Sequence, residues 1–249
     1  MYKYTSYIVL TILIFLMNGC SSITVQEKME DQLCEAFEDD SIPLLNRFFE
    51  EWHQLKKPIT DFEFENTNDT VRILYNVFND FSNTEIRKYP KLFNSPYCII
   101  QSTLKFRISS RKHLDYPLPA LTIIVVDTLK DFRPAPNLLS SKIIYKNDFY
   151  DKILDDFIKS DCGEDNEKKY NDLTWRGWPR ANFLEQVVHI HAALLGFSYH
   201  TLPYVSLDFN KDLSEVIIHS SLASSWTSEL FALREGKWKF IKYFYTAVN

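Results

Sequence analysis

The chain has 249 residues, of which 45% are hydrophobic, 24% charged and 15% aromatic, a composition that excludes disordered and collagen-like proteins. A formal net charge of −5, with no run of Lys and Arg, argues against a nucleic-acid partner, because phosphate binding needs a basic surface.

The N-terminus has the pattern of an export signal. Lys3 precedes an apolar run over residues 7–17, about half the roughly 20 residues that a membrane-spanning helix needs. The run leads into Leu16-Met17-Asn18-Gly19-Cys20, which resembles the lipobox of bacterial lipoproteins. This resemblance implies that residues 1–19 are removed and that Cys20 is acylated, with palmitate as a typical chain. A plain secretory signal or an uncleaved anchor is the alternative.

Ser21 follows the lipidated cysteine. In the proteobacterial sorting pattern that this resembles, a serine there implies the outer membrane, with the periplasmic or surface face left open. Residues 20–40 come next, and seven acidic side chains oppose one lysine in them. Such a segment is predicted to be a solvated tether or a marginal helix.

Three cysteines remain after Cys20, namely Cys34, Cys98 and Cys162. An odd number without close-pair spacing allows at most one intramolecular disulfide and excludes a paired CxxC metal site. Cys98 stands in the apolar string of residues 97–100 and is predicted to be a buried, inert thiol. The redox state of each cysteine is left open.

Three amphipathic helices are predicted within a single domain over residues 41–249. Apolar residues recur at helical spacing in residues 45–55, 71–81 and 149–158. Ser41 is a candidate cap for the first helix and Pro58 follows its end, while the turn-rich residues 66–69 precede the second.

Extended segments follow. Residues 97–109 and 121–128 are predicted strands that can pair as a hairpin across a polar loop. Residues 204–209, 215–222, 228–234 and 237–245 are predicted to form an antiparallel meander, with Glu235-Gly236 as a tight turn. The predicted class is α+β, a curved antiparallel sheet packed on N-terminal helices.

The segment Trp175-Arg176-Gly177-Trp178-Pro179-Arg180 is a candidate ligand-binding loop. Two tryptophans between arginines can stack on a sugar ring or bind an acidic ligand, although a loop tryptophan also commonly caps the edge of a core. His200, just before the final sheet, is a further candidate. A glycan-binding surface that uses Trp175 and Trp178 is therefore one alternative function.

A metal-assisted hydrolase is another alternative. His189 and His191 would face the same side of a strand, with His200, Asp208 or His219 as a third ligand, but on a helix they would point apart. The acidic residues 161–172 lack the ligand spacing of a calcium-binding loop. Motifs such as GxSxG, HExxH and GxGxxG do not occur, so no catalytic residue, metal or cofactor is assigned.

The order of elements is similar to that of nuclear-transport-factor-2-like lipoproteins of Gram-negative bacteria. The similarity rests on the lipobox, on residues 69–78 as the second helix, on residues 199–204, and on a terminal hairpin containing Gly236-Lys237-Trp238-Lys239. It implies a cone-shaped α+β domain over most of residues 41–249. The acid/base pair of enzymes in that superfamily has no match here, so we expect a non-catalytic, lipid-anchored envelope protein that binds a small molecule, a glycan or a partner protein.

Overall fold

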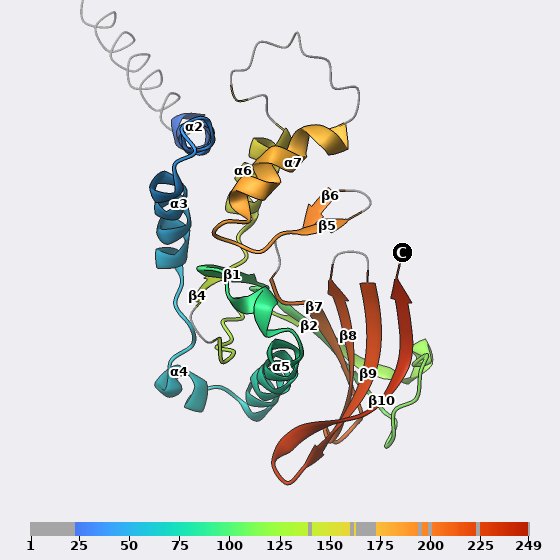
Figure 1. Ribbon diagram of the computed structural model, residues 1–249. Helices are drawn as coiled ribbons and strands as arrows, with labels where there is room; N and C mark the ends of the chain where they lie inside the picture. The colour runs from blue at the N-terminus through green and yellow to red at the C-terminus, as the bar shows by residue number, and fades with distance from the viewer. Residues whose placement is uncertain are drawn as a thin grey trace, which may run out of the picture.

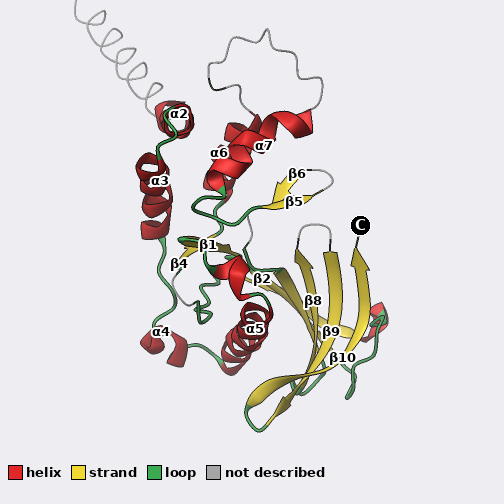
Figure 2. Cartoon of the chain, in the orientation of Figure 1, coloured by secondary structure: helices red, strands yellow, loops and turns green. Residues whose placement is uncertain are grey.

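The computed structural model describes residues 23–138, 141–159, 162, 173–193, 196–198, 201–222 and 225–248. The predicted signal peptide, Cys20 and the acidic loop after Cys162 lie outside these ranges. The described chain forms an α+β fold, in which a group of helices and a curved sheet lie side by side (Figures 1 and 2). The predicted fold class is confirmed at this level. Among the described helices, none is long and apolar enough to cross a bilayer.

The helical part is built from α2 (Ile23–Glu38), α3 (Ile42–Leu55), α6 (Asp148–Lys159) and α7 (Leu173–Leu184). Helices α3 and α6 lie where the apolar spacing predicts them. The inward stripe of α3 consists of Leu45, Phe48, Phe49 and Trp52, all buried. Ser41 precedes α3 as its N-cap residue, but its side chain makes no capping hydrogen bond. These aromatic side chains fill the first of two large cores.

Of the two alternatives predicted for residues 20–40, a solvated tether or a marginal helix, the structure has a helix over residues 23–38, and this helix is docked rather than solvated. Met29, Leu33 and Ala36 share one face of α2 and are buried in the first core, while the acidic side chains occupy its other faces. A disulfide joins Cys34 to Cys162, 128 residues further along the chain. Although the segment is acidic in composition, its short apolar stripe is sufficient to dock the helix.

A two-stranded parallel sheet separates the two large cores. Strand β1 (Tyr97–Ile100) pairs with β4 (Lys142–Tyr145), and both lie at the centre of the molecule. Ile99 and Ile144 point into the first core, whereas Cys98, Ile100 and Tyr145 point into the second. Cys98 is fully buried, as predicted, and burial raises the pKa of its thiol to about 12.

The prediction of one continuous strand over residues 97–109 is wrong, because the structure has two strands there. The chain leaves β1 at Ile100 and enters a different sheet at Leu104, where β2 (Leu104–Ser109) begins. Between them, the side-chain amide of Gln101 donates to Val205 O at 3.1 Å and its oxygen accepts from Val205 N at 2.6 Å. These bonds replace strand pairing at the break, so a buried polar side chain satisfies the backbone there.

The main sheet has six strands in the order β10-β9-β8-β7-β2-β3. The remaining strands are β3 (Ile123–Leu129), β7 (Tyr204–Phe209), β8 (Glu215–Leu222), β9 (Ser225–Arg234) and β10 (Lys237–Val248). Neighbours are antiparallel except β2 and β7, which are parallel. The predicted β2–β3 pairing and the terminal meander are confirmed. The β9–β10 turn places Glu235 at φ 54° and Gly236 at φ 75°, the left-handed geometry of a tight hairpin.

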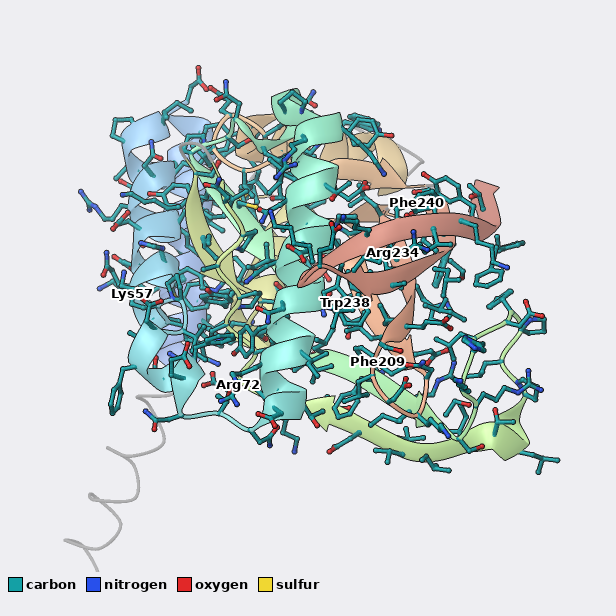
Figure 3. All side chains as sticks on the ribbon, turned by 90° about the horizontal axis from the view of Figure 1, so that it is seen from below. Lys57, Arg72, Phe209, Arg234, Trp238 and Phe240 are labelled. Atoms are coloured by element: carbon teal, nitrogen blue, oxygen red, sulfur yellow. A yellow bond between two sulfur atoms is a disulfide. The ribbon has the colours of Figure 1, made fainter. Side chains whose placement is uncertain are left out.

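Helix α5 (Asp69–Lys88) covers one face of this sheet and forms the second core with it. The Asn68 side chain accepts a hydrogen bond from Val71 N at 2.8 Å and so caps the predicted helix start. Figure 3 places Trp238 beside α5, and the backbone N of Trp238 donates to Asp80 on α5 at 3.0 Å. The ring of Phe81 meets that of Phe231 edge-on at 6.1 Å.

Short elements complete the chain: α4 (Asp61–Glu65), the 3-10 turns η1 (Pro90–Phe93) and η2 (Ala120–Thr122), and a small hairpin of β5 (His191–Ala193) and β6 (Gly196–Ser198). Residues 110–120 cross the sheet face opposite α5, where Leu114 packs on Ile217 and Leu230.

We expect the Cys34–Cys162 disulfide to stabilise the docking of α2. Replacement of Cys34 by Ser should lower the free energy of unfolding by about 2–4 kcal/mol, because the crosslink restricts the unfolded chain. The melting temperature of the native protein should fall with a thiol reductant, while that of a Cys34→Ser/Cys162→Ser variant should not respond. Equal melting of the native protein with and without reductant would contradict this role.

Candidate functional site

A pocket of about 550 Å3 lies between the C-terminal end of α5 and the sheet, a volume within the range of small-molecule sites. Its wall on the helix side comes from Glu85, Lys88, Tyr89 and Phe93, and its sheet side from β8, β9 and β10. The sheet residues that line it are Ser220, Leu222, Ser225, Thr227, Glu229, Tyr243 and Thr246.

Strand alternation brings Glu229 into this pocket. Successive residues of β9 point to opposite faces of the sheet, so Thr227, Glu229 and Phe231 share the face that α5 covers. Phe231 packs against Phe81 of α5, which confirms the direction of this face. Glu229 is therefore an acidic residue at an inward position, and only 4% of its surface is exposed.

The carboxylate of Glu229 is incompletely satisfied. Its Oε1 accepts a hydrogen bond from Thr227 Oγ1 at 3.1 Å, and Thr227 Oγ1 is itself 2.7 Å from Ser220 Oγ. Its Oε2 is buried and has no hydrogen-bond partner among the described residues. A buried carboxylate oxygen without a partner destabilises a fold, so its retention at a pocket wall favours a role in binding.

The electrostatic surroundings favour the protonated form of this acid more than water does. Burial is the largest influence and raises the pKa of Glu229, and the nearby Glu85 acts in the same direction. Lys88 and the Thr227 hydroxyl oppose them without cancelling the shift. Lys88 itself donates to Glu85 Oε1 at 2.6 Å, so its positive charge acts on both Glu85 and Glu229.

The remaining surface of the pocket is apolar and aromatic. Phe93 is buried, whereas Tyr89 and Tyr243 are about half exposed and flank the solvent side. Pro203 and Leu222 add further apolar contacts. An apolar wall with few polar groups is typical of a small-molecule site, in which Glu229 would fix the orientation of the ligand. A single carboxyl group also provides one proton donor or acceptor.

A second polar cluster lies on the opposite face of the sheet. Asp208 is 2% exposed and is held by Arg107, whose Nε donates to Oδ1 at 2.6 Å. His219 lies between Asp208 Oδ2 at 2.8 Å and Ser228 Oγ at 2.9 Å, and Tyr116 packs against the His219 ring at 5.9 Å.

This cluster is a satisfied structural network. Burial is the strongest influence on Asp208 and opposes its ionisation, but bonds from His219 and Arg107 outweigh burial and lower its pKa. Although the order Asp208, His219, Ser228 resembles a catalytic triad, Ser228 is buried in the middle of β9. The guanidinium also neutralises the carboxylate that such a triad would need.

The predicted ligand-binding loop is helical. Trp175, Arg176, Trp178 and Arg180 belong to α7, which contains Pro179, so the prediction of a loop at residues 175–180 is wrong. The cause is that residues 173–184 pack on the first core through Ala181, Phe183 and Leu184. Trp178 is 41% exposed. The side chains of Trp175 and Arg176 lie outside the described part.

Arg180 is buried rather than presented to a ligand. Its guanidinium stacks on the ring of Phe37 at 5.3 Å, and its Nε lies 3.4 Å from the sulfur of Cys162. It therefore joins α7 to the disulfide-linked end of the molecule.

The histidine predictions are only partly within the described chain. His189 lies before β5, with its Nδ1 3.4 Å from Glu185 Oε1, and His191 is the first residue of β5. The side chain of His191 and the whole of His200 lie outside the described residues. Within the described ranges, no group of three or more His, Cys, Asp or Glu side chains can hold a metal ion.

Sequence reasoning missed Glu229 because residues 228–234 were predicted only as a strand of the meander, without an assignment of its faces. The available signal was the alternation itself, since Glu229 lies two residues before the inward Phe231. An acidic residue at an inward strand position is rare unless it is paired or functional.

Comparison with known proteins identifies no relative. No protein-family model matches the chain, and no curated protein or solved structure is significantly similar to it.

We expect Glu229→Gln to stabilise the protein at neutral pH. Because the folded pKa of Glu229 is raised, the folded state holds the proton more tightly than the unfolded state does. The carboxylate therefore destabilises the fold at neutral pH, and this penalty decreases as the pH falls through the folded pKa towards the ordinary value of 4.5. Thermal unfolding of both proteins from pH 4 to pH 8 should show the largest difference at the upper end; a difference independent of pH would contradict it.

Proposed function

We propose that this protein is a lipid-anchored cell-envelope protein that binds a small organic molecule in the pocket between α5 and the sheet. The observation that carries the proposal is the buried Oε2 of Glu229, which lacks a partner among the described residues and lies at the wall of a pocket of ligand size. A ligand group that donates a hydrogen bond would satisfy this oxygen.

The pocket defines the chemistry of the ligand. Its charged side chains are Glu85, Lys88 and Glu229, so acids outnumber bases. Because Lys88 forms its ion pair with Glu85, Glu229 is the acid of the pocket without a direct ion-pair contact among the described residues. The aromatic side chains of Phe93, Tyr89 and Tyr243 suit a flat or apolar body. An amine or a hydroxyl compound with such a body fits both features better than an anion does.

Export of the chain is supported by two independent features. The first is the signal pattern with its lipobox-like residues 16–20 and Ser21, which favour acylation at Cys20 and the outer membrane. The second is the Cys34–Cys162 disulfide, because disulfides persist in oxidising compartments such as the bacterial periplasm and the cell surface.

The resemblance to nuclear-transport-factor-2-like lipoproteins is retained within this proposal. Its support is a curved, largely antiparallel sheet that has a long helix on one face (Figure 1), together with the pocket that lies between the helix and the sheet. The parallel β2–β7 neighbours and the separate helical core of α2, α3, α6 and α7 are additions to a minimal cone.

Ligand binding should depend on Glu229. A thermal-shift screen of the native protein against aromatic amines, aminosugars, polyols and aromatic carboxylates should give its largest positive shifts among amines and hydroxyl compounds. For the best compound, Glu229→Gln should raise the dissociation constant at least tenfold, because an amide oxygen is a weaker acceptor than a carboxylate. Isothermal titration measures this change directly.

The matched control is Glu235→Gln, which changes an exposed acid at the β9–β10 turn. It should leave the dissociation constant unchanged. Carboxylates as the preferred class, or equal affinity of the native protein and Glu229→Gln, would contradict the assigned role of Glu229.

Membrane attachment should depend on Cys20. In cells fed an alkyne analogue of palmitate, the native protein should incorporate label and sediment with membranes, whereas Cys20→Ser should lose the label and fail to be processed as a lipoprotein. Cys98→Ala, a change at a buried thiol, should keep the label. Unlabelled native protein would contradict lipidation.

A further inference from the structure

The two edges of the six-stranded sheet differ in how they are protected. At one edge, β10 carries Lys237, Lys239 and Lys242 and has two irregularities in its pairing with β9. Lysines and bulges are devices that prevent an edge from pairing with another chain. At the other edge, β3 pairs with β2 alone among the described strands, and Asp127 is its single charged residue.

Strand β3 also exposes apolar side chains. Ile124 and Val126 are 63% and 73% exposed, and Leu121 just before the strand is fully exposed. A β-branched apolar strand with an open edge is a site for strand addition, because its free backbone groups pair with an incoming strand.

A groove on the α5 side of β3 lies beside this edge. It has a volume of about 470 Å3 and is bordered by Val71 and Leu74 of α5 and by Phe106, Ile108 and Val125 of the sheet. Alternate side chains of an added strand would lie over this groove. The others would lie on the opposite face of the sheet beside Val126, whose partner on β2 is Arg107. The edge and the groove thus suit an extended, apolar segment.

We propose that this edge pairs with β3 of a second copy of the chain, in an antiparallel arrangement around a two-fold axis near Val126. Such an arrangement sets residues 121–125 of each copy against residues 127–131 of the other, so Asp127, Lys130 and Asp131 all meet uncharged residues. It places Asp127 opposite Val125 of the second copy, so no two like charges face each other across the pair.

The ladder between the two copies is short. Asp127 Oδ1 accepts a hydrogen bond from Thr128 N at 2.7 Å, which fills that donor and limits pairing to the residues around Val126. The pairing of β3 with β2 also has an irregularity near Ile124, between the partners Ile123 and Val125. Most of the stabilisation therefore comes from burial of the apolar side chains. The dimer is independent of the ligand pocket, which lies towards the other edge of the sheet, beside β8, β9 and β10.

The test is the mass and crosslinking of the full-length protein in mild detergent. Sedimentation equilibrium should give a dimer, and Val126→Lys should convert it to a monomer, whereas Val126→Thr should leave it dimeric. Because Val126 is exposed, the melting temperature of the isolated Val126→Lys subunit should stay close to that of the native protein at low concentration.

Crosslinking supplies a readout that does not depend on disruption. Val126→Cys should form a crosslinked dimer with a short bis-maleimide, while Lys239→Cys at the β10 edge should not. Background reaction is read from the native protein, in which Cys34 and Cys162 form a disulfide and Cys98 is buried, so Cys20, when it is not acylated, is the remaining thiol. A monomer at all concentrations, a dimer that survives Val126→Lys, or equal crosslinking at both edges would overturn the proposal.

Discussion

The alternation of side chains along β1 and β4 is the constraint on which the rest of the molecule depends. Ile99 and Ile144 point to one side and Cys98 and Ile100 to the other, so one pair of strands closes two hydrophobic cores. Hydrogen bonds also join the backbone of these two strands to other segments of the chain. Trp52 Nε1 donates to Tyr145 O at 3.1 Å, and Ile99 N donates to Thr201 Oγ1 at 3.1 Å. A shift of one residue in this pairing would reverse every side chain and unpack both cores at once.

Each face of the curved sheet buries a carboxylate, and the two carboxylates differ in their hydrogen-bond partners. On the face opposite α5, Asp208 is compensated by Arg107 and His219, whose bonds offset the cost of its burial. On the α5 face, Glu229 remains uncompensated at Oε2, so its burial weakens the fold. The two acids lie in neighbouring parts of one meander, and their contrast favours binding as the reason for Glu229. Functional sites often contain groups that lower the stability of the fold.

Much of the fold follows from residue periodicity. The stripes of α3, α5 and α6, and the turn at Glu235-Gly236, are local signals, and the structure confirms them. Local signals failed where tertiary packing decides the outcome. Residues 23–38 are acidic in composition but dock through Met29, Leu33 and Ala36, and the 175–180 segment is helical despite Pro179.

The strands that form the pocket could be predicted from the sequence, but the pocket itself could not. Glu229 acquires its significance from the approach of Lys88 and Phe93, which precede it by more than 130 residues. That approach depends on the packing of α5 across the sheet, which periodicity along β9 does not specify. By contrast, the aromatic and basic residues 175–180 were conspicuous in the sequence, yet Arg180 serves the disulfide-linked core.

The Cys34–Cys162 bond has a mechanical consequence for a chain held by its N-terminal end. Tension applied at the N-terminal side reaches α2 first, and a helix held by noncovalent contacts alone would peel away turn by turn. The covalent link passes that load directly to the end of α6 and Arg180 on α7, so the helical part bears it as one body.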